Sequence, residues 1–132
     1  MSRENVQTFR RAIDAFNDGD MELVASVLDS DSEWDWSRSI GPDRAIYRGP
    51  SEIVGFWEEF TSGFDAVRIE IEDIVEAGDQ LVAAVLSVMS GRDGIEVEAR
   101  NAWLVTLRDG RLARLEMFQA KHEALQAAGL GE

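Results

Sequence analysis

The chain has 132 residues, of which 45% are apolar and 30% are charged, and it contains no cysteine. A chain of this length buries roughly 65–70% of the surface that its unfolded form exposes, so a single domain can fold without a disulfide or a structural metal. The absence of cysteine excludes disulfide scaffolds, thiol nucleophiles and cysteine-ligated zinc sites. These numbers predict one domain over residues 1–132.

Acidic residues outnumber basic ones by 26 to 13, which gives a formal net charge of −13. Such a charge repels phosphate backbones and anionic membrane surfaces. No run of apolar residues approaches the roughly 18 that a membrane span needs, and Met1 to Arg10 has no apolar stretch like that of a signal peptide. We therefore expect a cytoplasmic protein that has neither nucleic acid nor a membrane as its partner.

The first half of the chain combines helical patterns with one strand pattern. Apolar residues from Val6 to Phe16 recur every three or four positions, which predicts an amphipathic helix. Acids at odd positions and tryptophans at even ones predict a strand over 29–36 with two unlike faces. The expected elements are a helix from Ser2 to Asn17-Asp18-Gly19, a short helix from Asp20 to Leu28, the strand over 29–36, a long loop over 37–50 with Gly41-Pro42 and Gly49-Pro50, and a helix from Pro50 that ends before Gly63.

The second half changes to patterns that are typical of strands. Residues 81–89 are apolar at nearly every position, as expected of a central strand covered on both faces. One strand is expected to begin at Ala66, and three more to run over 81–89, 95–107 and 112–119. Turns are expected at Gly78-Asp79, Arg92-Asp93-Gly94 and Asp109-Gly110, and a short helix or frayed end over 121–130. This order indicates an α+β fold with helices on one face of an antiparallel sheet.

Short motifs stand at the corners of these elements. They are Asn17-Asp18-Gly19-Asp20, Trp34-Asp35-Trp36, Tyr47-Arg48-Gly49-Pro50, Gly78-Asp79, Leu107-Arg108-Asp109-Gly110-Arg111 and the tail from Glu123 to Leu130. Together with the order of elements, they resemble the SnoaL-like polyketide cyclase family, which belongs to the nuclear transport factor 2-like superfamily that also contains the ketosteroid isomerases. The resemblance extends over essentially the whole chain, so the single domain expected over 1–132 is a SnoaL-like domain.

The resemblance implies a cone-shaped architecture. In that architecture a curved antiparallel sheet wraps around three helices from the N-terminal half of the chain and encloses an apolar pocket. The family also implies a homodimer formed through the outer face of the sheet. Members include isomerases, cyclases, epoxide hydrolases, dehydratases and binding modules, so the fold alone selects no activity.

The catalytic positions of two of these enzyme groups fall on residues that lack the required side chains. The resemblance places the tyrosine of the ketosteroid isomerases at Ala12, their general base at Trp36 and their second aspartate at or near Trp103. The Asp-Arg-Asp arrangement of limonene epoxide hydrolases begins near Val85 and ends near Met117. The known acid–base groups of both classes are therefore missing.

Two carboxylates are the remaining candidates for acid–base catalysis. Asp35 is one residue away from the general-base position, and in a strand an offset of one residue turns the side chain to the opposite face. Glu116 would face inward if the last strand were shifted by one residue. An enzyme of the isomerase or cyclase type would use Asp35 or Glu116 to move a proton on a small hydrophobic carbonyl compound.

Tryptophans and one asparagine on inward faces indicate a pocket for a small apolar molecule. An indole ring supplies a large apolar area and an N–H donor. Asn101 interrupts an apolar face, and a buried amide needs a partner, which a ligand carbonyl or a neighbouring backbone group could supply. Packing of the core explains the tryptophans equally well. The expected ligand-binding residues are Trp34, Trp36, Tyr47, Trp57, Asn101, Trp103 and Met117.

The sequence predicts neither a metal site nor a cofactor. His122 is the only histidine, and the acids between 29 and 35 lack the glycine and the closing glutamate of a calcium loop, whose places are taken by Trp34 and Ile40. Three functions stay open: an enzyme acting on a hydrophobic carbonyl compound, a non-catalytic small-molecule-binding protein that lacks the acid–base residues of the family, and an interaction module with a filled core.

Overall fold

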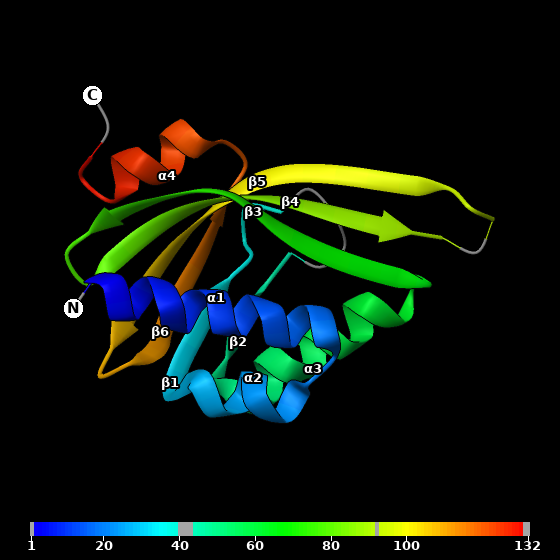
Figure 1. Cartoon of the computed structure of the whole chain (residues 1–132), viewed down its shortest axis with the longest axis horizontal. Helices are drawn as coiled ribbons and strands as arrows, with labels where there is room; N and C mark the ends of the chain where they lie inside the picture. Colours follow the sequence, from blue (N-terminus) through cyan, green and yellow to red (C-terminus); the bar gives the residue numbers. More distant parts are fainter. Residues whose placement is uncertain (1, 40–43, 92, 131–132) are drawn as a thin grey trace.

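The computed structural model describes residues 2–39, 44–91 and 93–130, and within them the chain forms four helices and one sheet of six strands (Figure 1). The helices are α1 (Ser2–Asp18), α2 (Met21–Val27), α3 (Gly49–Ser62) and α4 (Lys121–Ala127). The strands are β1 (Leu28–Asp35), β2 (Ile46–Arg48), β3 (Ala66–Ala77), β4 (Gln80–Ser90), β5 (Glu96–Arg108) and β6 (Arg111–Phe118). None of the described helices is both long and apolar enough to span a membrane.

The sheet has the strand order β2-β1-β6-β5-β4-β3 and confirms the α+β class. All neighbours are antiparallel except β1 and β6, which run parallel, so the prediction of a purely antiparallel sheet was wrong at this one pair. A parallel pair needs a long crossover. Here α3 and the whole β3–β4–β5 meander separate the two strands in the chain, and they bring β6 back beside β1 in the same direction.

The region expected to be a long loop contains a short strand. β2 pairs with β1 and places Tyr47 opposite Trp34. The Gly41-Pro42 part of this predicted loop lies outside the described residues, as does Arg92 of the predicted Arg92-Asp93-Gly94 turn. The Asp109-Gly110 hairpin is confirmed, because both residues have positive φ values of 54° and 77°, as a type I′ turn requires.

Helices cover both faces of the sheet rather than one. In Figure 1, α1, α2 and α3 lie against the concave face, and α4 lies on the opposite side. The concave side holds the main hydrophobic core. The helices contribute Phe9, Phe16, Ile53, Phe56 and Trp57 to it, the strands contribute Trp34, Leu81, Val105 and Leu115, and Trp36 joins them directly after β1. On the outer face Ala124 of α4 packs against Val82, Ala102, Leu104 and Phe118. The tail is therefore a docked helix and not a frayed end.

The side chain of Asn17 joins α1 to the sheet. Its Nδ2 donates to the Ile69 carbonyl at 2.9 Å, and its Oδ1 accepts from the Ile69 amide at 2.8 Å. Ile69 is only 2% exposed, so these two bonds satisfy backbone groups at a place that is poorly accessible to water. The amide thus acts like an additional strand residue that fixes the end of α1 against β3.

Asn17→Ala should therefore destabilise the protein by about 1–3 kcal/mol, because it leaves the donor and the acceptor of Ile69 without their partner. Urea unfolding followed by circular dichroism measures this change. Asp18→Asn, at the exposed neighbouring position, is the control and should change the free energy of unfolding by less than about 0.5 kcal/mol. Equal stability of the two variants would contradict the proposed role of Asn17.

Candidate functional site

A cavity of about 250 Å³ lies between α3 and the concave face of the sheet. The strands that form its wall are β3, β4, β5 and β6, and the segments that follow β1 and β6 complete it. The lining residues are Trp36, Ser39, Phe56, Trp57, Phe60, Ile69, Ser87, Met89, Ala99, Arg100, Asn101, Trp103, Met117 and Gln119.

Aromatic rings make up much of the cavity wall. The Trp36 ring contacts Trp103 with 5.8 Å between ring centroids and Phe56 with 5.6 Å. On α3, Trp57 and Phe60 stack at 5.7 Å, because residues three positions apart lie on the same side of a helix. Offset and edge-to-face pairs of this kind are favourable beyond their buried area. The wall is therefore apolar and braced by contacts between its own rings.

Two polar atoms of lining residues have no hydrogen-bond partner among the described residues. They are Oδ1 of Asn101 and Nε1 of Trp103, and both atoms are buried. Ser32 Oγ and Trp34 Nε1 are also buried and unpaired, but neither residue lines the cavity. Buried polar groups without partners are rare in folded proteins. Asn101 and Trp103 are the two residues of this group that line the cavity.

The structure brings five of the seven expected ligand-binding residues together. Trp36, Trp57, Asn101, Trp103 and Met117 line the cavity. The other two, Trp34 and Tyr47, are not among the lining residues and form a layer behind it: Trp34 is stacked on Trp36 with 6.0 Å between centroids, and Tyr47 is stacked on Phe56 at 4.4 Å.

Several lining residues were not predicted from the sequence. Ser87 and Met89 lie on the face of β4 that also carries the core residues Leu81, Ala83 and Val85. Their odd positions in the strand place them on the same face, and this alternation could have identified them. Gln119 follows the end of β6, and no periodic pattern marks it.

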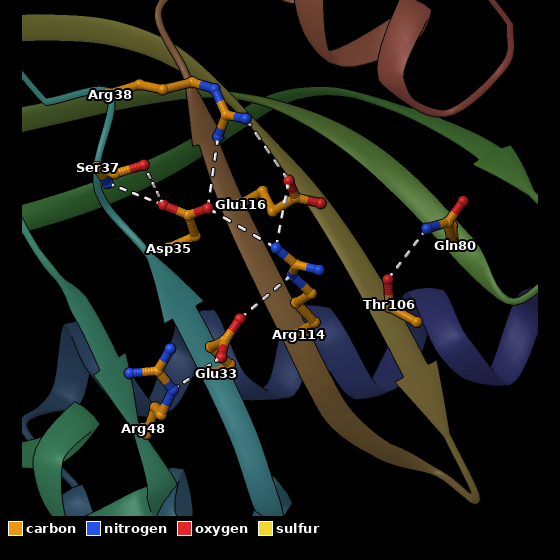
Figure 2. Close-up of polar contacts among 9 residues, drawn as sticks. All are labelled: Glu33, Asp35, Ser37, Arg38, Arg48, Gln80, Thr106, Arg114 and Glu116. Carbon is orange, nitrogen blue, oxygen red and sulfur yellow. Dashed lines mark hydrogen bonds and ion pairs between the residues drawn. The ribbon is translucent and has the colours of Figure 1, made fainter.

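The two predicted catalytic carboxylates lie elsewhere. Asp35 and Glu116 are paired neighbours on β1 and β6, and their side chains belong to an ionic cluster that does not line the cavity (Figure 2). Trp34 and Trp36, on either side of Asp35, belong to the concave core, so the alternation of the strand turns Asp35 to the outer face. Glu116 follows the same rule between the core residues Leu115 and Met117. The structure thus brings the two acids together, but away from the cavity.

We call this group the outer ionic cluster; it consists of Glu33, Asp35, Arg38, Arg48, Arg114 and Glu116. Like charges directly opposite each other on adjacent strands are destabilising. Two arginines offset this repulsion: Arg114 Nη2 lies 3.7 Å from an oxygen of Asp35 and 3.7 Å from an oxygen of Glu116, and Arg38 reaches the same two oxygens at 3.8 Å. The carboxylates are therefore held as ion pairs.

Asp35 is the most buried acid of the outer ionic cluster, with 6% of its surface exposed. Burial alone raises the pKa of this carboxyl group. The hydrogen bonds from the Ser37 hydroxyl and backbone amide, together with the charges of Arg38 and Arg114, outweigh burial and lower the pKa below its ordinary value. Asp35 is accordingly a charged structural anchor near neutral pH rather than a group poised to exchange a proton.

The outer ionic cluster also fixes the rim of the cavity. The Arg38 guanidinium lies 4.2 Å from the centroid of the Phe118 ring, and the Arg38 carbonyl accepts a 2.7 Å hydrogen bond from Gln119 Nε2. Trp36 and Ser39, which lie close to Arg38 in the chain, and Gln119 itself all line the cavity. Ion pairs on one face of the sheet thus hold the segment that shapes the cavity on the other.

Replacing Asp35 by Asn should destabilise the protein by about 1–2 kcal/mol near pH 7, because the arginines and Ser37 lose a buried charged partner. The folded pKa is depressed, so the stabilisation is fully present above the unfolded pKa, whose ordinary value is 3.8, and is lost as the pH falls through the lower folded value. The difference between wild type and variant should therefore shrink below about pH 4. Urea titrations over this pH range measure it.

Asp31→Asn, at an exposed position on the same strand, is the control for this series and should change stability little at any pH. A destabilisation by Asp35→Asn that stays constant down to the lowest pH would contradict the assigned cause.

No group of three or more potential metal-ligating side chains occurs within residues 2–39, 44–91 and 93–130. The only ionisable side chain among the described lining residues is that of Arg100, whose Nε donates to Glu72 at 3.1 Å. The uncharged polar groups of the described lining are the side chains of Ser39, Ser87, Asn101 and Gln119 and the indole N–H groups of the tryptophans, and the rest of the lining is largely apolar.

Residues 9–115 match the model of the SnoaL-like domain, so the chain belongs to the SnoaL-like family. Uncharacterised proteins from Mycobacterium tuberculosis and Mycobacterium bovis are 27% identical to it over 123 residues, which cover 89% of this chain and 90% of theirs.

Solved structures share the fold at low sequence identity. TerC, co-crystallised with polyporic acid, is 19% identical, with a TM-score of 0.77 over 96% of this chain and 98% of its own. RV0760c from Mycobacterium tuberculosis, in complex with estradiol-17beta-hemisuccinate, is 12% identical, with a TM-score of 0.75 over 86% and 92%. A Catenulispora acidiphila protein with a ketosteroid isomerase-like fold, in complex with trimethylamine, is 15% identical, with a TM-score of 0.74 over 93% and 92%. These likenesses confirm the nuclear transport factor 2-like cone predicted from the sequence.

Proposed function

We propose that this SnoaL-like protein binds a small, neutral, largely apolar molecule in the cavity and does not supply an acid–base group to it. The observation that carries this proposal is the chemistry of the described lining residues. They provide five aromatic rings and no carboxylate, imidazole or phenol. A site of this kind gains affinity from burial of apolar surface.

The size of the cavity limits the ligand. An engineered cavity of about 150 Å³ admits benzene, and ligand pockets for larger molecules begin near 300 Å³. A cavity of about 250 Å³ therefore suits a molecule of one or two rings. The ligands held by TerC and RV0760c support the view that this fold accommodates cyclic organic molecules, although those proteins share under a fifth of their residues with this chain.

The alternative function, an isomerase or cyclase acting on a hydrophobic carbonyl compound, needs a proton-transfer group within reach of the substrate. Asp35 and Glu116 were its candidates, and both are tied to arginines on the outer face. Neither of them lines the cavity, and the described lining residues include no carboxylate. The binding function therefore has the stronger support.

A matched pair of variants on β5 tests binding in the cavity. Ala99 lines the cavity, and its neighbour Glu98 is exposed and points to the other face. Ala99→Phe should weaken the binding of 2-methylnaphthalene, a two-ring probe, by at least about tenfold, because the added ring occupies the ligand's space. Glu98→Phe should leave the affinity unchanged within about twofold. Quenching of tryptophan fluorescence during titration measures both.

Failure of the wild-type protein to bind any neutral one- or two-ring probe would overturn the proposed function. Equal losses in the two variants would show that the probe binds somewhere other than the cavity.

We further propose that the protein forms a homodimer through the outer face of the sheet. α4 covers part of this face by packing on Val82 and Leu104, and the strands beside it present ion pairs such as Arg100 with Glu72 and Arg68 with Glu70. Sedimentation equilibrium should give twice the 14.7 kDa mass of the chain. A monomer that persists as the concentration rises would contradict this assembly.

A further inference from the structure

Asn101 and Trp103 both line the cavity, and each carries one buried polar atom that has no hydrogen-bond partner among the described residues. The residues are two positions apart on β5, so their side chains leave the same face of the sheet. Both residues line the cavity, and Trp103 is only 1% exposed, which keeps bulk water from satisfying its N–H. A partner for these atoms has to come from inside the cavity.

The two atoms have opposite hydrogen-bonding roles. The Asn101 oxygen can only accept, and the indole N–H of Trp103 can only donate. They could satisfy each other, yet no hydrogen bond joins them. A single ligand group that both accepts and donates, such as a hydroxyl, can satisfy both atoms at once.

We infer that the cavity selects ligands that carry a hydroxyl group, whose oxygen accepts from Trp103 Nε1 and whose proton is donated to Asn101 Oδ1. This inference rests on the proposed function and deepens it by naming the ligand class: neutral one- or two-ring alcohols or phenols. A bare ketone or ether leaves the Asn101 oxygen unpaired, and a hydrocarbon leaves both atoms unpaired. An ionised carboxylate has no proton to donate, and the Arg100 guanidinium, the only cationic group among the described lining residues, is engaged with Glu72 on the outer face of the sheet.

Two probes of nearly the same shape isolate the hydroxyl group. 2-Naphthol and 2-methylnaphthalene differ in whether the substituent is a hydroxyl or a methyl group. The measured quantity is the ratio of their dissociation constants on each protein, Kd of 2-methylnaphthalene divided by Kd of 2-naphthol. Comparison of this ratio between proteins cancels the different transfer free energies of the two probes from water.

Asn101→Leu and Trp103→Phe should each lower this ratio by roughly fivefold to tenfold relative to wild type, which is the effect of losing one hydrogen bond. Trp34→Phe is the matched control, because it also removes an unpaired buried indole N–H, but from a residue that does not line the cavity. It should leave the ratio unchanged within about twofold.

A second readout uses the wild-type chain. In ¹H–¹⁵N NMR spectra, 2-naphthol should move the Trp103 indole resonance downfield, as expected of a new hydrogen bond, and 2-methylnaphthalene should not. This measurement remains decisive if one of the variants fails to fold.

The results separate this inference from the proposed function. If both probes bind to wild type and neither the ratio nor the indole resonance responds to the hydroxyl group, the hydroxyl selectivity is wrong and the binding function stands. If neither probe binds to wild type, the proposed function fails and the selectivity fails with it.

Discussion

The alternation of side chains along β1 is the constraint on which the rest of this structure depends. Trp34 and Trp36 enter the concave core, and Glu33 and Asp35 emerge on the opposite face. A shift of one residue in this part of the strand would turn these carboxylates toward the core and these indoles toward the outer face. The strand and Trp36 directly after it thus place indole rings at and behind the cavity wall and carboxylates in the outer ionic cluster, on opposite faces of the sheet.

This separation has a chemical consequence. Asp35 and Glu116 lie side by side in the parallel pairing of β1 and β6, and Arg38 and Arg114 neutralise them there. Their charge strengthens the fold near the cavity rim and is absent from the cavity itself. The part of the chain that the structure describes therefore presents an aromatic cavity whose lining residues include Asn101, with a buried acceptor, and Trp103, with a buried donor. These features are the basis of the binding function that we propose.

Local patterns were sufficient to predict most of the fold. The Asn17-Asp18-Gly19 stop, the alternation in β1 and the Asp109-Gly110 turn each depend on a few neighbouring residues, and the structure confirms them. The resemblance of short motifs supplied the cone-shaped arrangement. The same alternation predicted that Asp35 would face outward, and five of the residues predicted to bind a ligand line the cavity.

Features that depend on contacts between distant segments could not be predicted from the sequence. The parallel pairing of β1 with β6, the bonds of Asn17 to Ile69 and the docking of α4 on the outer face each join segments separated by long stretches of chain. The lack of a hydrogen-bond partner for the Asn101 oxygen among the described residues also depends on the positions of distant segments. The sequence shows that an amide interrupts an apolar face, but only the arrangement of its neighbours shows that none of the described residues satisfies it.

A crystal structure of the protein grown with 2-naphthol would test the account most directly. We expect the naphthol rings between the Trp36, Trp57 and Phe60 side chains, with the hydroxyl oxygen within hydrogen-bond distance of both Asn101 Oδ1 and Trp103 Nε1. A cavity that stays empty at saturating naphthol, or a ring bound with its hydroxyl group turned away from both atoms, would contradict the account.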